Sequence, residues 1–200
     1  MEALKVQRPD DGVLSEEEKD NAARLTTSRV WIVDPLDGTR EYGEARTDWA
    51  VHIALAIDGV AHTGAVALPG LGLTLATDNP PALAPAAGQL RMLVSRTRPA
   101  AEAVAVAERL GAALVPMGSA GAKAMAVLRN EADIYLHSGG QFEWDSCAPV
   151  AVAQAAGLHV SRIDGSALKY NQENVYLPDL LVCRKEHAAQ VLGLIKEVSQ

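Results

Sequence analysis

The alternation of apolar and polar positions divides this chain into a β-rich first part and a second part in which strands and helices alternate. In the first part, apolar runs bounded by turn residues predict strands, and Asp58-Gly59 between two of them is typical of a hairpin turn. We therefore expect an antiparallel sheet there. The polar residues 1–11 predict neither helix nor strand. The apolar runs are 31–33, 49–57, 60–68 and 72–76.

In the second part, apolar runs of strand length alternate with segments of helical length, which predicts layered α/β packing. Residues 78–89 are rich in Pro and Ala and are typical of a linker. We therefore expect a first domain over 1–88 and a second over 89–200. Strands are expected at 90–94, 114–117, 133–136, 159–163 and 180–184, and helices at about 100–110, from 118 onward, 144–156 and 187–198.

The stretch Asp34-Pro-Leu-Asp-Gly-Thr39 concentrates oxygen donors directly after an apolar run. Pro35 fixes its own φ and favours an extended conformation before it, so we expect the strand to end there and a type I turn to follow. Such a turn brings the carboxylates of Asp34 and Asp37 and the carbonyl of Leu36 to one side, a ligand set that suits Mg²⁺. A strand-ending turn with solvated acids is the alternative interpretation.

Two further acidic segments lie far from this stretch in the sequence. Ser15-Glu16-Glu17 upstream supplies carboxylates, although a Ser followed by acids is also typical of a helix N-terminus. Asp145, after a Gly-rich loop, is either a residue favoured by the helix dipole or another member of the same acidic group. Carboxylates at close range raise one another's pKa, so such a group requires cations. Two Mg²⁺ ions about 3.5–4 Å apart would meet that need.

Composition narrows the class of partner. A net charge of −7 argues against a nucleic-acid polymer or an anionic membrane, but a bound metal can reverse the sign locally for a small phosphorylated substrate. Cys147 and Cys183 match no ligand or redox spacing, so we expect buried, reduced thiols in a cytoplasmic protein. No apolar run reaches transmembrane length, and no secretory signal is visible.

The acidic motifs, in this order, resemble the inositol monophosphatase superfamily of Mg²⁺-dependent, lithium-sensitive phosphatases. The resemblance runs from about residue 12 to the C-terminus and implies that family's layered sandwich, with an antiparallel N-terminal sheet and a smaller mixed-sheet C-terminal part. Within the superfamily, Arg40-Glu41-Tyr42 and His137 are most similar to the corresponding segments of CysQ-type 3'(2'),5'-bisphosphate nucleotidases. The motifs that carry the resemblance are Asp34-Pro-Leu-Asp-Gly-Thr39, Ser15-Glu-Glu17 and Trp144-Asp-Ser-Cys-Ala-Pro149.

The resemblance also implies roles for individual residues. Thr39, with Glu16 or Glu17, would orient and deprotonate a water that attacks phosphorus in line, without a covalent phosphoenzyme. Two Mg²⁺ ions are implied, with a third left open. The expected metal ligands are Glu16, Asp34, the Leu36 carbonyl, Asp37 and Asp145. The expected substrate contacts are Gly38, Thr39, Arg40, Ser95, Arg96, Ser119, Lys123 and His137, and a solvated face is the alternative for Arg96, Arg98 and Lys123.

The implied activity is hydrolysis of 3'-phosphoadenosine 5'-phosphate to AMP and phosphate, which removes a by-product of sulfur assimilation. An inositol-1-phosphate or fructose-1,6-bisphosphate phosphatase is the alternative among enzymes. The chain lacks the family's N-terminal helices, so we expect a fragment of a full enzyme, or else a short relative that binds metal or nucleotide without turnover. An apolar sheet face left bare by those helices would favour a homodimer or aggregation.

Overall fold

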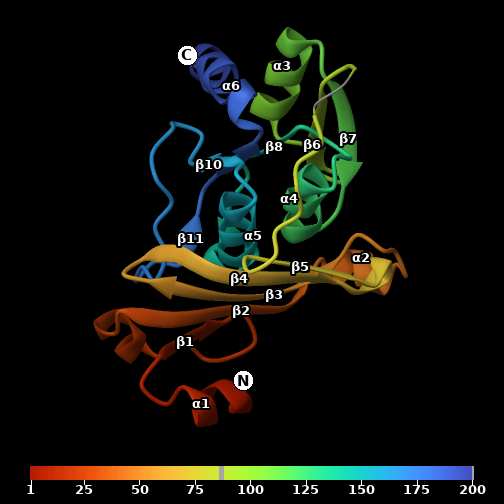
Figure 1. The fold of residues 1–200 in the computed structure, drawn as a ribbon. Helices are drawn as coiled ribbons and strands as arrows, with labels where there is room; N and C mark the ends of the chain where they lie inside the picture. Colours follow the sequence, from red (N-terminus) through yellow and green to blue (C-terminus); the bar gives the residue numbers. More distant parts are fainter. Residues whose placement is uncertain (86–87, 200) are drawn as a thin grey trace.

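The computed structural model describes residues 1–85 and 88–199, which are arranged in layers (Figure 1). A five-stranded sheet packs against helices α4 and α5, whose other side packs against a second five-stranded sheet. Helices α3 and α6 cover the outer face of the second sheet. The predicted layered sandwich is therefore confirmed. The helices are α3 (Ala101–Leu110), α4 (Ala120–Leu128), α5 (Glu143–Ala155) and α6 (Lys185–Val198).

The first sheet has the strand order β1-β2-β3-β4-β5 and is antiparallel from β2 to β5. Strand β1 pairs with β2 in parallel, so the prediction of an antiparallel sheet is wrong for this one pair. Four residues are too few to show how a strand will pair. The turn predicted at Asp58-Gly59 joins β3 to β4. The strands are β1 (Gly12–Ser15), β2 (Arg29–Asp37), β3 (Ala50–Ile57), β4 (Val60–Leu68) and β5 (Leu73–Ala76).

Strand β2 continues to Asp37, so the expectation that it ends at Asp34 is wrong. Its pairing with β3 shifts register between Asp34 and Asp37, and Pro35, which has no N–H to donate, is tolerated at such an irregularity. The backbone N–H of Leu36 donates instead to Asp34 Oδ1 at 2.9 Å. Short helix α2 (Thr39–Gly43) follows directly, and a 3₁₀ turn, η2 (Pro69–Leu71), connects β4 to β5.

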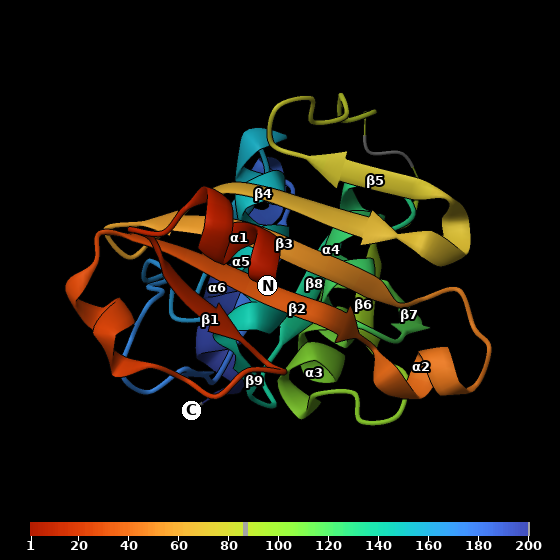
Figure 2. The ribbon, with the colours of Figure 1, turned by 90° about the horizontal axis from the view of Figure 1, so that it is seen from below.

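The N-terminal segment also differs from its prediction. Residues Glu2–Gln7 form helix α1, but six residues without a buried face show no helical periodicity in the sequence. Ser15 ends β1 and a turn follows it, so the alternative of a helix starting at Ser15 is wrong. A 3₁₀ helix, η1 (Ala22–Thr26), precedes β2. Figure 2, which looks onto the outer face of the first sheet, shows α1 on this face.

The second sheet is mixed, as predicted, with the strand order β10-β12-β8-β6-β7. Alternate residues of its central strands face opposite layers. Leu93 and Tyr135 belong to the core shared with α4, α5 and the first sheet, whereas Met92 and Ile134 pack under α3 and α6. A two-stranded ribbon of β9 (Gln141–Phe142) and β11 (Tyr176–Leu177) was not predicted. The strands of the sheet are β6 (Arg91–Ser95), β7 (Ala113–Met117), β8 (Ile134–His137), β10 (His159–Ser161) and β12 (Leu180–Cys183).

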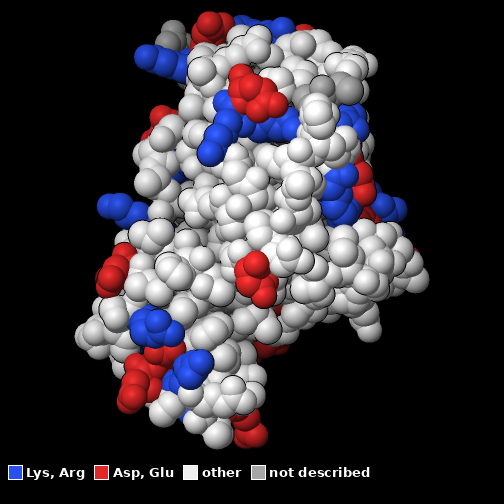
Figure 3. All heavy atoms as spheres, in the orientation of Figure 1, with Lys and Arg blue, Asp and Glu red and all other residues white. Residues whose placement is uncertain are grey.

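The larger core contains residues from both sides of the predicted linker, and the division into domains 1–88 and 89–200 stays a prediction. Residues 78–85 and 88–90 form no helix or strand, as expected for a linker, and residues 86 and 87 lie outside the described part of the chain. Cys147 and Cys183 are buried and free, as predicted. Within the described residues, no helix is both long and apolar enough to cross a membrane. Charges of both signs lie at the two ends and along the side edges of the face drawn in Figure 3, while its centre is largely uncharged.

Candidate functional site

Three carboxylates from distant points of the sequence meet between the first sheet and α5. Asp34 and Asp37 come from the end of β2, and Asp145 comes from the first turn of α5. One oxygen atom of each lies within 4.8 Å of the other two. We call these residues the aspartate cluster. Hard oxygen donors at this spacing are a set that could hold a divalent metal ion such as Mg²⁺.

Burial makes two members of the aspartate cluster difficult to ionise. Burial, followed by the charge of Asp37, raises the pKa of Asp34 to about 8, and the same two effects raise the pKa of Asp145 to about 6. Bringing ionised carboxylates together in a buried place is unfavourable unless a cation accompanies them. The chemistry of the cluster therefore fits a bound divalent cation.

Asp37 has different surroundings, because it lies at the N-terminus of α4. Its Oδ2 accepts hydrogen bonds from Ser119 Oγ at 2.5 Å and from the Gly121 N–H at 2.7 Å, and its Oδ1 accepts one from the Ala120 N–H at 3.2 Å. Burial opposes ionisation, but the neighbouring His52 and these donors outweigh it and lower the pKa of Asp37 to about 2. Asp37 is thus a carboxylate that the fold itself stabilises.

Asp145 satisfies both of the interpretations that its sequence context left open. Its Oδ2 accepts a hydrogen bond from the Phe142 N–H at 2.6 Å, which caps the start of α5. The same side chain belongs to the aspartate cluster. A helix cap fixes the carboxylate at a terminus where the helix dipole also favours negative charge.

Glu16 does not belong to the group of acids within 4.8 Å. Glu16 and Glu17 lie exposed in the turn after β1, and the parallel pairing of β1 with β2 brings this turn beside the end of β2. The charge of Glu16 is near enough to contribute to the raised pKa values of Asp34 and Asp145. The structure therefore gathers the acids of positions 34, 37 and 145 and leaves Glu16 at the edge of the group.

Thr39 and the Leu36 carbonyl, both predicted site groups, contact each other. Thr39 Oγ1 donates to the Leu36 carbonyl oxygen at 3.3 Å, at the start of α2. Gly38 caps this short helix with a φ of 89°, a conformation that favours glycine, and a Cβ there would lie 3.1 Å from Ser119 Cβ. The end of β2, the start of α2 and the start of α4 are therefore packed closely together.

A pocket of about 260 Å³ adjoins the aspartate cluster. Ser119, whose hydroxyl donates to Asp37, lies in its wall, so one residue contacts both features. Arg98 joins three predicted cationic residues in the lining, and these four outnumber the one acid there, Glu41, so this pocket is suited to an anion. The predicted substrate contacts that line it are Thr39, Arg40, Ser95, Arg96, Ser119 and Lys123.

Lys123 and Arg96 are each held in place by neighbouring groups. Lys123 is buried, and its Nζ donates to the Ser119 carbonyl at 2.6 Å and lies 5.3 Å from the centre of the Tyr135 ring. Burial lowers the pKa of Lys123 to about 8. Arg96 pairs with Glu41 at 3.0 Å and with Glu44 at 2.7 Å, both from the α2 segment. The ion pairs of Arg96 therefore link α2 to the end of β6.

Two predicted substrate contacts lie outside the lining of this pocket, Gly38 and His137. The Nε2 atom of His137 lies 3.0 Å from the Gly140 carbonyl, and burial lowers the pKa of this ring. Glu41 was not predicted as a functional residue. Its side chain is 9% exposed and lies so close to Gly118 that any Cβ at position 118 would overlap it.

His52 is the most informative residue that sequence reasoning missed. It is fully buried in β3, with Nδ1 2.9 Å from the Trp144 carbonyl oxygen and Nε2 3.2 Å from Asp37 Oδ2. Although burial disfavours a charged ring, the contact with Asp37 and the charge of that carboxylate raise the pKa of His52 to about 9. A signal was present in the sequence, because alternation along 50–56 places His52 on the inward face between small apolar residues.

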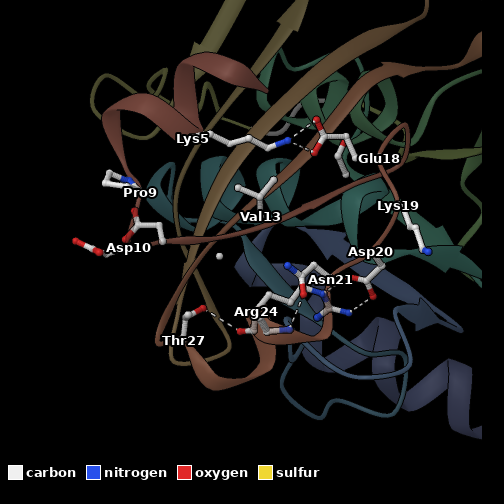
Figure 4. A pocket seen from close by; sticks show the side chains of 14 residues that line it. Lys5, Pro9, Asp10, Val13, Glu18, Lys19, Asp20, Asn21, Arg24 and Thr27 are labelled. Atoms are coloured by element: carbon white, nitrogen blue, oxygen red, sulfur yellow. Dashed lines mark hydrogen bonds and ion pairs between the residues drawn. The ribbon is translucent and has the colours of Figure 1, made fainter.

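A second pocket, of about 430 Å³, lies near the N-terminus between α1, β1 and η1 (Figure 4). Four of its charged side chains pair with one another, Lys5 with Glu18 at 3.0 Å and Arg24 with Asp20 at 2.7 Å. None of the clustered aspartates lines it. We therefore assign the candidate functional site to the aspartate cluster and the cationic pocket beside it.

Comparisons with known proteins found a matching family model and similar sequences and structures. A model described as the inositol monophosphatase family matches residues 1–200. The chain is 50% identical over 214 residues to a 3'-phosphoadenosine 5'-phosphate phosphatase of Mycobacterium leprae, covering 100% of this chain and 79% of that protein. It is 31% identical to the 3'(2'),5'-bisphosphate nucleotidase CysQ of Escherichia coli, covering 88% of this chain and 77% of that one. CysQ from Bacteroides thetaiotaomicron has a similar structure, with a TM-score of 0.76, 27% identity, and coverage of 92% of this chain and 81% of that chain.

Proposed function

Because this chain belongs to the inositol monophosphatase family, we propose that it is a Mg²⁺-dependent phosphatase that hydrolyses 3'(2'),5'-bisphosphate nucleotides. The names of the relatives from Mycobacterium leprae and Escherichia coli support 3'-phosphoadenosine 5'-phosphate as the substrate, with AMP and phosphate as products. The observation that carries the proposal is the aspartate cluster lying against a cationic pocket. A substrate with two phosphates can place one at each feature.

The metal would be held by Asp34, Asp37 and Asp145, with the Leu36 carbonyl and Glu16 at the edge of the site. These ligands are all oxygens, which suits Mg²⁺. Burial and the charge of Asp37 raise the pKa values of Asp34 and Asp145, and a bound cation would favour their ionised forms. We expect two ions in the functioning enzyme. Bound Mg²⁺ would stabilise the charge that develops on the phosphate oxygens and make a water molecule more acidic.

The hydroxyl of Thr39 would orient the attacking water. It lies at the end of the β2–α2 segment and is held by its hydrogen bond to the Leu36 carbonyl. Glu16, in the exposed turn after β1, would accept the proton of that water, and Glu17 in the same turn would support it. Attack in line with the leaving oxygen would release phosphate directly. The backbone N–H groups of Gly38 and Thr39 would bind its oxygens.

The second phosphate of the substrate would lie in the cationic pocket. Arg96 is oriented by Glu41 and Glu44, and Lys123 is oriented by the Ser119 carbonyl, so these two cations need little reorganisation on binding. Charge-assisted hydrogen bonds to phosphate are the strong class of hydrogen bond. Arg40, Ser95, Ser119 and, from β8, His137 would complete the contacts with the substrate.

Release of phosphate from matched substrates tests this proposal. The 1–200 chain would be incubated with 3'-phosphoadenosine 5'-phosphate, inositol-1-phosphate or fructose-1,6-bisphosphate, each with Mg²⁺ and with EDTA, beside the variant Asp34→Asn. We expect the highest kcat/KM for the bisphosphate nucleotide, and no turnover with EDTA or in the variant. Equal rates on inositol-1-phosphate would remove the preference for nucleotides. Nucleotide binding without turnover would favour a binding protein.

A further inference from the structure

We propose that His52 is a positioning residue that sets the separation of Asp37 and Asp145. Its imidazole ring connects the Asp37 carboxylate to the main chain of Trp144, the residue directly before Asp145. The inference rests on the proposed role of the aspartate cluster in metal binding. It adds a residue that contributes no ligand atom and does not touch the substrate pocket.

The ring spans two elements that carry the cluster. Nδ1 lies 2.9 Å from the Trp144 carbonyl oxygen, which can only accept, so this nitrogen carries a hydrogen and donates. Nε2 lies 3.2 Å from Asp37 Oδ2, in contact with the carboxylate at the end of β2. Because the ring is rigid and fully buried, the distance between these two contacts is fixed by the width of the imidazole itself.

A third element prevents the ring from turning. Gly121, in the first turn of α4, lies so close to the ring that a Cβ at this position would overlap His52 Nε2. The end of β2, the start of α4 and the start of α5 therefore all meet at this one side chain. His52 lies on β3, which pairs with β2 along its length, so the ring is anchored on a rigid strand.

The contact also selects which oxygen of Asp37 is left for a metal. Oδ2 accepts from Ser119 Oγ and the Gly121 N–H and contacts His52. Among the described residues, Oδ1 accepts a single, longer hydrogen bond, from the Ala120 N–H at 3.2 Å. Oδ1 therefore keeps free lone-pair capacity. Loss of the ring would free Asp37 to rotate and would remove the contact that holds the start of α5 beside it.

The expected effect is on metal affinity more than on substrate binding. Groups that orient metal ligands without binding the metal typically contribute about 10–100-fold to metal affinity or activity. We expect His52→Leu, which fills the same space without donors, to weaken Mg²⁺ binding by about 10–100-fold. His52→Gln keeps an amide that can replace one of the two contacts, so its Mg²⁺ affinity should lie between that of His52→Leu and that of the natural chain.

Mg²⁺ binding is measured directly by isothermal titration calorimetry, and by the Mg²⁺ concentration that half-saturates the thermal stabilisation of the 1–200 chain. Tyr170→Phe is the matched control. The Tyr170 hydroxyl is buried and lies 3.1 Å from Ser146 Oγ, which is also on α5, but it does not contact the aspartate cluster. We expect this variant to lower the melting temperature and to leave Mg²⁺ affinity unchanged. A general loss of stability would thus be separated from a loss of positioning.

Gly121→Ala disturbs the contact between His52 and Asp37 from the α4 side, and it tests the positioning role if His52→Leu does not fold. We expect it to weaken Mg²⁺ binding while the N–H that donates to Asp37 is retained. Unchanged Mg²⁺ affinity in His52→Gln and Gly121→Ala would overturn the inference. Tighter binding in the His52 variants would also overturn it, because the ring would then be a competitor of the metal. Absence of Mg²⁺ binding by the natural chain would instead refute the proposed function.

Discussion

Replacing Asp34 with Asn is expected to make the metal-free protein more stable while abolishing its activity. Asp34 is 1% exposed, and burial together with the charge of Asp37 raises its pKa from 3.8 to about 8. An unfolded chain restores the ordinary pKa. Asn has the shape of Asp, carries no charge, and its Oδ1 can still accept the hydrogen bond from the Leu36 N–H at 2.9 Å. The substitution therefore removes the charge and keeps the local structure.

The sign and size of the effect follow from linkage. A carboxyl group whose pKa is raised by folding binds more protons in the folded state than in the unfolded state. The destabilisation that Asp34 causes is therefore absent below about pH 4, grows as the pH rises, and is complete above about pH 8. At pH 7 the destabilisation corresponds to the roughly three pH units between the unfolded pKa of Asp34 and pH 7, which sets an upper limit of about 4 kcal/mol on its size. We expect Asp34→Asn to gain about 2–4 kcal/mol, or roughly 5–15 °C in melting temperature for a chain of this size.

Thermal and urea denaturation in EDTA at pH 5, 7 and 8 would measure this gain. Asp58→Asn is the control, because Asp58 is exposed in the β3–β4 turn at a φ of 49°, a conformation that Asn also tolerates. We expect the control to change stability by less than about 0.5 kcal/mol. Adding Mg²⁺ should stabilise the natural chain and not the Asp34→Asn variant. A variant that is no more stable than the natural chain at pH 7, or a gain independent of pH, would refute this account of the cluster.

Three further predictions follow from the site. Arg96→Met should raise KM for the bisphosphate nucleotide by about 10–100-fold, because charged hydrogen bonds to the second phosphate are lost, and should change KM for inositol-1-phosphate little. The control in the same kinetic assay is Arg109→Met, which breaks an exposed ion pair with Glu197 at 2.8 Å. Ser119→Ala removes both the N-cap of α4 and a hydrogen-bond donor to Asp37. Chemical denaturation should show a loss of about 1–2 kcal/mol of stability, and steady-state kinetics should show a lower kcat at fixed Mg²⁺. A loss of stability without a change in kcat would contradict the role of Ser119 in holding Asp37. Gly118→Ala should lower both stability and kcat/KM, because a Cβ at this position overlaps Glu41 and must displace the side chain that orients Arg96. Kinetics and a melting temperature equal to those of the natural chain would show that Glu41 moves without cost.

Much of the fold could be predicted because its strands, turns and helices depend on local sequence patterns. The strand–turn–strand sequence around Asp58-Gly59 predicts the β3–β4 hairpin, and the apolar runs after residue 90 predict the second sheet and its helices. Asp34 and Asp37 are close in the sequence, so their meeting in space depends on one turn. The parallel pairing of β1 and the continuation of β2 through Pro35 were missed, since pairing partners and register shifts are not local properties.

The order of residues along the chain shows which side chains are available for metal chemistry and where the strands that carry them run. Long-range packing of α4 and α5 between the two sheets brings Ser119 and Asp145 to the end of β2. It also decided that His52, one polar residue among small apolar ones, faces Asp37 and not solvent. Sequence periodicity shows which face of an element is buried, but the neighbours of that face are chosen by packing between segments that are far apart in the chain.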